Sequence, residues 1–223
     1  MTKRKKNPVD ISLYAIADPV RAMNRPLDML VRDAVSGGAS LVQYRDKLSA
    51  ARAMYEQALE INEALWDGNV PLIINDRADI AFAVRAGGVH LGQEDLFASD
   101  AREMLGDEAI IGLSVKTIEE AHAAPLEDLD YVFIGGVFET ASKNNPTAIG
   151  VEGWKERAAI IRKRDPEMPL GAIAGIDAGN IAELIAAGAD GVAVISAIFM
   201  ADDVVEAAGA LRRIIDDARQ TRH

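Results

Sequence analysis

The sequence contains no cysteine, only three histidines and few aromatic residues. Without cysteine the chain has no disulfide, no thiolate ligand for a metal and no cysteine nucleophile. The three histidines, His90, His122 and His223, leave no room for a histidine-rich metal centre. Aromatic residues make up 5% of the chain, so the core must be built mainly from aliphatic side chains.

Long apolar segments are also missing. The longest, residues 191–201, is far shorter than the ~20 residues that a membrane-spanning helix needs. The basic residues 3–6 are followed by Asn7, Pro8 and Asp10 rather than by an apolar segment, so we expect no signal peptide. These absences predict a cytoplasmic protein with no membrane partner.

The charge balance is acidic, with a formal net charge of -11 and a sequence pI near 4.8. An acidic surface repels nucleic acid, so we expect no nucleic-acid partner. The basic run at residues 3–6 is interpreted as part of a solvated, disordered tail covering residues 1–11. An anionic substrate would need a local cluster of cations to hold it.

Eight short apolar runs alternate with segments of helical periodicity, as in a parallel sheet that is buried on both faces. The strands are predicted at residues 12–18, 39–45, 71–76, 88–92, 109–115, 129–137, 170–176 and 191–196. The helices are predicted at residues 27–35, 50–66, 78–85, 100–105, 118–123, 153–163, 178–187 and 204–219. This count predicts the α/β class: a single-domain (β/α)₈ TIM barrel over residues 12–219. A doubly wound sheet is less favoured, because Asp18-Pro19 rather than a glycine-rich loop follows the first strand.

Two helix starts and one loop carry more specific signals. Ser49 is predicted to cap the second helix, and Thr117 with Glu120 predicts a capping box. The segment from Phe138 to Gly150 is polar and turn-rich, without periodicity, and is interpreted as an active-site lid.

Polar residues gather where the predicted strands end, which is where barrel enzymes place their chemistry. The cations are Arg45, Lys47 and Lys143, the neutral donors are Asn75 and Ser114, and the carboxylates are Asp76 and Asp95. Cations together with two carboxylates favour Mg²⁺ and a diphosphate. Gly175, Ile195 and Ser196 follow strands 7 and 8, the usual position for a phosphate monoester. Two phosphorylated small-molecule substrates are therefore expected.

Structural interpretations of the same residues stay open. Arg45 and Lys47 could form a surface pair, and Asp76 or Asp95 could pair with Arg77 or cap a helix. His90 lies in an apolar strand and is more typical of a core histidine.

Six motifs, in order along the chain, resemble the thiamine-phosphate synthase family. They are QYRDK at 43–47, IINDRAD at 73–79, GVHLGQED at 88–95, IGLSV at 111–115, FETASK at 138–143 and GVAVISAI at 191–198. The resemblance runs from about Leu13 to about Leu211. It implies a transferase that joins 4-amino-5-hydroxymethyl-2-methylpyrimidine diphosphate to 4-methyl-5-(2-phosphooxyethyl)thiazole, releasing pyrophosphate through a pyrimidine carbocation.

The resemblance also implies roles for individual residues. The pyrimidine diphosphate would be held by Gln43, Tyr44, Arg45, Asp46, Lys47, Asn75, Ser114 and Lys143, of which Arg45, Lys47, Ser114 and Lys143 would act in catalysis. Mg²⁺ would be bound by Asp76 and Asp95. The thiazole phosphate would be held by Thr140, Ala141, Ser142, Gly175, Ile195 and Ser196.

The departures from the family pattern fall on the thiazole side. Glycine stands at 136 where a proline is usual, Glu139 replaces a second proline, and Ala174 replaces one of two glycines. Glycine at 136 is expected to loosen the loop. The alternatives are therefore a thiazole tautomerase-like enzyme, a non-catalytic relative that binds thiamine precursors, and a synthase with another acceptor. The helical outer face could support a homo-oligomer, although no motif specifies one.

Overall fold

The computed structural model describes residues 6–66, 69–139 and 148–221, and within them the predicted barrel is confirmed. Eight parallel strands form a closed sheet in chain order, and β1 pairs with β8 to complete it. The strands are β1 (Leu13–Ala17), β2 (Leu41–Tyr44), β3 (Leu72–Asn75), β4 (Gly88–Leu91), β5 (Ile110–Val115), β6 (Tyr131–Ile134), β7 (Leu170–Ile173) and β8 (Gly191–Val194). Each lies within its predicted range.

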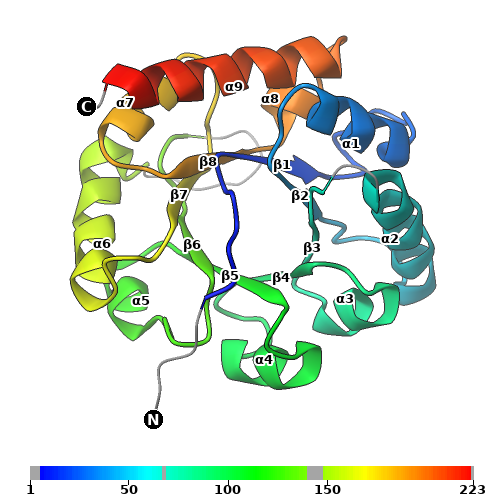
Figure 1. Cartoon of the computed structure of the whole chain (residues 1–223), viewed down its shortest axis with the longest axis horizontal. Coiled ribbons are helices and arrows are strands. Elements are labelled where there is room, and N and C mark those ends of the chain that lie inside the picture. Colours follow the sequence, from blue (N-terminus) through cyan, green and yellow to red (C-terminus); the bar gives the residue numbers. More distant parts are fainter. Residues whose placement is uncertain (1–5, 67–68, 140–147, 222–223) are drawn as a thin grey trace.

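Helices surround the barrel on the outside (Figure 1). They are α1 (Leu27–Ser36), α2 (Ala51–Leu65), α3 (Ala78–Val84), α4 (Ala98–Leu105), α5 (Ile118–Ala123), α6 (Gly150–Arg164), α7 (Ile181–Ala186), α8 (Ser196–Phe199) and α9 (Val204–Thr221). All eight predicted helices are present, and α8 was not predicted, because its apolar residues continue the β8 run without a break. Among the described residues, no helix combines the length and the apolar composition needed to cross a membrane.

Alternate residues of each strand face two different hydrophobic clusters. In β1, Leu13, Ala15 and Ala17 pack in the cluster shared with the helices, whereas Tyr14 and Ile16 pack in the barrel interior. Both faces of the sheet are therefore buried, which explains why the strands read as continuous apolar runs.

Of the two predicted helix caps, one is confirmed and one is wrong. The Glu120 amide donates to Thr117 Oγ1 over 3.1 Å, and the Glu120 side chain accepts from the Thr117 amide, which completes the capping box. Ser49 does not cap α2, because the residue that precedes the helix is Ala50. The Ser49 amide instead donates to Asp46 Oδ1 over 3.0 Å, so Ser49 belongs to the turn after β2.

Residues 6–11 lie across the amino-terminal end of the barrel, as the start of the chain in Figure 1 shows. Lys6 Nζ donates to the carbonyls of Leu126 and Leu129, each over 2.8 Å, and the Asn7 amide donates to Asp130 Oδ1 over 2.8 Å. Among the described residues, Lys6 and Asn7 already contact the barrel, although both lie before the predicted boundary at residue 12. Residues 1–5 of the predicted tail lie outside the described residues.

At this end of the barrel, a buried ion pair connects α4 to the residue before β6. Arg102 of α4 donates to Asp130 Oδ2 over 2.7 Å and to the carbonyls of Ala109 and Asp128. Asp130 Oδ2 also accepts from the Ile111 amide over 2.9 Å. The Asp130 side chain is fully buried, so its ion pair with Arg102 offsets part of the cost of burying the charge.

We predict that Arg102→Met will lower the free energy of unfolding by about 3–5 kcal/mol, because it removes a buried cation that pairs with a buried carboxylate. The matched control is Arg213→Met, which removes the exposed pair between Arg213 and Glu206 and should cost less than about 1 kcal/mol. Urea denaturation of both variants measures the difference. Equal losses of unfolding free energy in the two variants would show that the buried ion pair stabilises the protein no more than the exposed one.

Candidate active site

The carboxyl ends of β1, β2 and β3 bring two cations and two carboxylates together. Arg45 follows β2 and donates to Asp18 Oδ2, at the end of β1, over 2.6 Å. Lys47 forms an ion pair with Asp76, which directly follows β3. Both cations therefore sit at this edge of the barrel, as predicted, and each has a carboxylate partner there.

Asp76 and Asp95 form a carboxylate pair. Desolvation and contact with the Asp95 carboxylate raise the pKa of Asp76, and Lys47 only partly offsets this. The backbone holds both residues in place: the Asp76 amide donates to the His90 carbonyl over 2.8 Å, and Asp95 Oδ2 accepts from the Gly92 amide over 2.7 Å. Asp76 has a φ of 61°, a left-handed conformation that aspartate tolerates better than most residues. Two adjacent carboxylates in a partly buried place favour a bound cation.

Asn75 is the last residue of β3, and its side chain is buried. Its Nδ2 atom has no hydrogen-bond partner among the described residues. Because a buried amide donor without a partner costs about 1–3 kcal/mol, this donor points to a ligand that completes its hydrogen bonds.

The barrel interior contains a chain of polar contacts that ends at two predicted site residues. Gln43 Nε2 donates to the Tyr14 hydroxyl over 2.8 Å, which lies 2.9 Å from the Tyr131 hydroxyl. His90 contacts the Tyr131 hydroxyl through Nδ1 over 3.1 Å and Ser114 Oγ through Nε2 over 2.8 Å. Burial lowers the pKa of His90 to about 4, so its ring is neutral at pH 7. The core interpretation of His90 agrees with this environment.

Two predicted binding residues use their side chains within the protein. Tyr44 packs in the cluster between the sheet and the helices, and its hydroxyl donates to Asp46 Oδ2 over 3.1 Å. Asp46 Oδ1 accepts from the amides of Leu48 and Ser49 over 2.8 and 3.0 Å. These contacts shape the turn that carries Arg45 and Lys47.

Gly175 follows β7, and Ile195 and Ser196 follow β8, the strand that pairs with β1; Ser196 begins α8. Gly175 has a φ of 66°, and a Cβ atom there would lie 2.4 Å from the Glu139 carbonyl oxygen. The loop after β6 therefore begins in contact with the end of β7. Four predicted residues of this loop, Thr140, Ala141, Ser142 and Lys143, lie outside the described residues.

Two departures from the family pattern have left-handed backbones. Gly136 has a φ of 75°, which proline cannot adopt because its ring fixes φ near -65°. Glycine therefore permits a different backbone here, rather than only loosening the loop. Ala174 has a φ of 90°, a strained value for a residue with a side chain.

The sequence analysis missed four residues of this site. Asp18 directly follows β1 and is the partner of Arg45; its place after an apolar run is the signal that indicates it. Gln93 Nε2 donates to the Ser114 carbonyl over 2.7 Å and lies within the GVHLGQED motif. Tyr14 and Tyr131 stand inside apolar runs, where only their hydroxyl groups hinted at a polar role.

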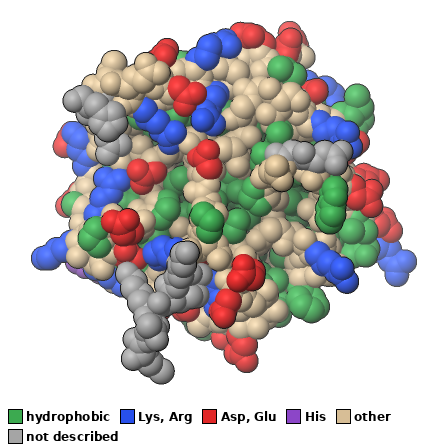
Figure 2. Space-filling view, viewed as in Figure 1, with side chains coloured by type: hydrophobic (Ala, Val, Ile, Leu, Met, Phe, Trp, Pro, Cys, Tyr) green, Lys and Arg blue, Asp and Glu red, His purple; other side chains and the backbone are tan. Residues whose placement is uncertain are grey.

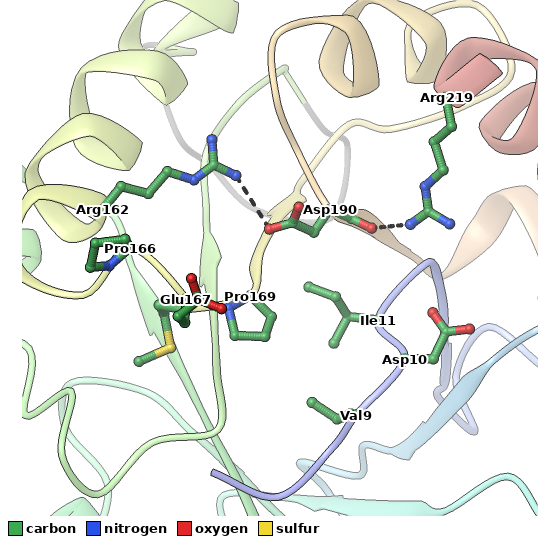
Figure 3. A pocket seen from close by; sticks show the side chains of 10 residues that line it. Val9, Asp10, Ile11, Arg162, Pro166, Glu167, Pro169, Asp190 and Arg219 are labelled. Carbon is green, nitrogen blue, oxygen red and sulfur yellow. Dashed lines mark hydrogen bonds and ion pairs between the residues drawn. The ribbon is translucent and has the colours of Figure 1, made fainter. Parts of the chain in front are cut away.

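A pocket of about 440 Å³ lies at the other end of the barrel (Figure 3). Val9 and Ile11 line it together with Asp190, which pairs with Arg162 over 3.3 Å and accepts from Arg219 through its carbonyl. Figure 2 shows this face, with apolar side chains at its centre and charged ones around them. None of the predicted site residues lines this pocket.

A closed parallel barrel with polar side chains at the carboxyl ends of its strands is the architecture of a (β/α)₈-barrel enzyme. Residues 13–198 match the family model described as thiamine monophosphate synthase. The chain is 48% identical to the thiamine-phosphate synthase of Agrobacterium fabrum, covering 97% of this chain and 99% of that protein. It is 43% identical to that of Moorella thermoacetica, covering 93% and 97%.

A solved structure supports the same family assignment as the sequence relatives. The thiamine phosphate pyrophosphorylase from Pyrococcus furiosus superimposes with a TM-score of 0.81 at 35% identity, covering 94% of this chain and 97% of that one. The chain belongs to the thiamine monophosphate synthase family, a family of transferases, and the resemblance noted in the sequence is confirmed.

We predict that Asp95→Asn will stabilise the ligand-free protein at pH 7 by up to about 1 kcal/mol. The pKa of Asp76 is raised in the folded protein above its ordinary value of 3.8. Its favourable contribution to the free energy of unfolding is therefore complete below pH 3.8 and is lost as the pH rises through the pKa of the folded state. Removing the Asp95 charge removes the part of that loss that Asp95 causes and leaves the part due to burial, so the gain should vanish at acid pH. Denaturation from pH 3 to 8 measures it.

The control for this prediction is Asp79→Asn. Arg77 donates a hydrogen bond of 2.6 Å to Asp79 and lowers the pKa of that carboxyl group. Neutralising Asp79 should therefore lower the free energy of unfolding at pH 7 and not raise it. A loss of stability in Asp95→Asn at pH 7 would contradict the carboxylate pair.

Proposed function

We propose that this chain joins 4-amino-5-hydroxymethyl-2-methylpyrimidine diphosphate to 4-methyl-5-(2-phosphooxyethyl)thiazole and releases pyrophosphate and thiamine phosphate. One observation carries the proposal beyond family membership: the carboxyl ends of the adjacent strands β2 to β5 carry Arg45, Lys47, Asn75, Asp76, Asp95 and Ser114. This combination of cations, neutral donors and paired carboxylates suits a diphosphate bound with a divalent cation.

The cations at this edge of the barrel are opposite in sign to the net charge of the whole protein. With a net charge of -11, the chain repels anions at long range, so a diphosphate needs local positive groups. Arg45 and Lys47 are partly exposed, with side-chain exposures of 25% and 51%, and so remain accessible to a ligand. Lys143 would add a third cation from the loop after β6.

Asp76 and Asp95 fit a magnesium site. Magnesium typically takes one or two carboxylates from the protein and the remaining oxygens from phosphate and water. The raised pKa of Asp76 reflects a carboxylate that lacks full compensation, which a divalent cation beside it would supply. Bound there, Mg²⁺ would contribute positive charge next to the diphosphate. The same side chains could not provide a complete site for zinc, which prefers nitrogen and sulfur ligands.

The proposed reaction needs no base or nucleophile from the protein. The C–O bond of the pyrimidine hydroxymethyl group breaks, and its electron pair leaves with the diphosphate. The thiazole nitrogen then donates its lone pair to the resulting carbocation, forming the C–N bond without losing a proton. Arg45 and Lys47 stabilise the departing charge, and Asn75 Nδ2 offers the substrate its free donor.

The thiazole phosphate would bind on the β7–β8 side. Gly175, Ile195 and Ser196 follow these two strands, where (β/α)₈ barrels commonly bind phosphate monoesters. Thr140, Ala141 and Ser142 would complete this side from the loop after β6. In this arrangement the acceptor nitrogen faces the pyrimidine across the barrel mouth, which favours direct capture of the cation.

Mass spectrometry of the purified protein with both substrates and Mg²⁺, with and without EDTA, tests the proposal. We expect thiamine phosphate only when metal is present. Arg45→Ala should lower kcat by about 10²–10³-fold, since it removes charge stabilisation of the leaving group. The control is Lys155→Ala, which removes an exposed cation that pairs with Glu152 on α6.

The negative outcomes separate the alternatives. If pyrimidine diphosphate binds in Mg²⁺ but no thiamine phosphate forms, the chain is a sensor or uses another acceptor. If it does not bind at all, the assignment of Arg45, Lys47, Asn75, Asp76, Asp95 and Ser114 to a diphosphate is wrong.

A further inference from the structure

A continuous chain of hydrogen bonds crosses the barrel interior and links two sides of the site. It runs from Gln43 on β2 through Tyr14, Tyr131 and His90 to Ser114 on β5, over successive distances of 2.8, 2.9, 3.1 and 2.8 Å. The three middle side chains belong to residues that are almost fully buried. These three residues are buried, whereas Gln43 and Ser114 at the two ends are proposed to contact substrate.

The orientation of the Gln43 amide sets the direction of this chain of hydrogen bonds. Gln43 Nε2 donates to the Tyr14 oxygen, so the Tyr14 proton has the Tyr131 oxygen as its acceptor. The Tyr131 proton is then donated to His90 Nδ1, which must be unprotonated to accept it. The ring proton consequently resides on Nε2 and is donated to Ser114 Oγ.

This order determines what each end offers a ligand. Ser114 Oγ accepts from His90, so its own proton is free and the hydroxyl is a donor towards the site. Gln43 uses an amide proton inward, and its Oε1 has no partner among the described residues, so it is an acceptor.

Reversing one end reverses the other. If the Gln43 amide turned over, Oε1 would accept from Tyr14 and each hydrogen bond along the chain would change direction. Ser114 would then donate to His90 Nε2 and would have no proton for a ligand. The chain therefore couples the orientation of Gln43 to that of Ser114, although the two residues lie on different strands.

We propose that Tyr14, Tyr131 and His90 are positioning residues that make Ser114 a hydrogen-bond donor to the diphosphate when Gln43 accepts from the pyrimidine amino group. This inference rests on the proposed function for the identity of the ligand. An anionic leaving group requires donors, so the order seen in the chain is the productive one.

The order of the chain can be tested without turnover. Nitrogen-15 NMR of the whole protein reports the tautomer of each histidine ring, and the loss of one signal in His90→Gln identifies His90. We expect a neutral ring protonated on Nε2, and in Tyr131→Phe a mixture of tautomers. A wild-type ring protonated on Nδ1 would overturn the proposal.

The coupling is tested by steady-state kinetics with the pyrimidine diphosphate. Tyr131→Phe removes the central link and should lower kcat/KM by about tenfold. The matched control is Phe133→Leu, which alters the same interior cluster, 5.7 Å from Tyr131 between ring centres, without breaking the chain, and should cost less than about threefold. Equal effects of the two variants would overturn a positioning role.

A double-mutant cycle then distinguishes positioning from packing. Gln43→Ala and Ser114→Ala should be coupled by about fivefold in the wild type and additive in the Tyr131→Phe background. Unchanged coupling in that background would contradict the proposal, and Tyr14→Phe provides the same test if Tyr131→Phe does not fold. If the wild type makes no thiamine phosphate, the proposed function fails, and the histidine tautomer still decides the order of the chain.

Discussion

Closure of the barrel is the constraint on which the site depends. Pairing of β1 with β8 places the carboxyl ends of all eight strands around one opening. Arg45 can then reach Asp18, and Lys47 can reach Asp76, although 27 and 29 residues separate the partners in sequence. Each strand contributes only four to six residues, so the register between neighbours, rather than strand length, sets where these side chains meet.

The ligand-free site is electrostatically incomplete. Asp76 has a raised pKa beside Asp95, and Asn75 retains a buried donor without a described partner. Such features cost stability and are typical of functional sites, where a ligand supplies the missing interactions. Lys47 pairs with Asp76, and in the proposed function the same cation would also bind a phosphate of the substrate.

The sequence allowed the barrel to be predicted, together with the position of several candidate residues at the strand ends, because both depend on local patterns. Apolar runs marked all eight strands, and strand ends marked Arg45, Asn75 and Asp76. The four-residue helix α8 was not predicted, because its apolar residues continue the apolar run of β8.

Interactions between distant strands were not predictable in this way. The link from Tyr14 to Tyr131 spans 117 residues, and no local pattern indicates which hydroxyl groups meet inside a barrel. Ser49 is a residue type that often caps helices, yet its amide donates to Asp46 in the turn before α2. The side-chain geometry of Asp46 decides this, and the sequence alone does not show it. The left-handed backbone of Gly136 likewise depends on the contacts of the loop base, since its carbonyl accepts from the Ile149 amide over 3.0 Å.

We propose that Asp76 and Asp95 bind magnesium together with a diphosphate at the mouth of the barrel. Calorimetric titration with pyrophosphate, in the presence and absence of Mg²⁺, tests it most directly. We expect metal-dependent binding by the wild type and by Asp79→Asn, and a loss of at least about tenfold in affinity for Asp76→Asn and Asp95→Asn. Equal binding by all four proteins, or binding that ignores Mg²⁺, would contradict the account.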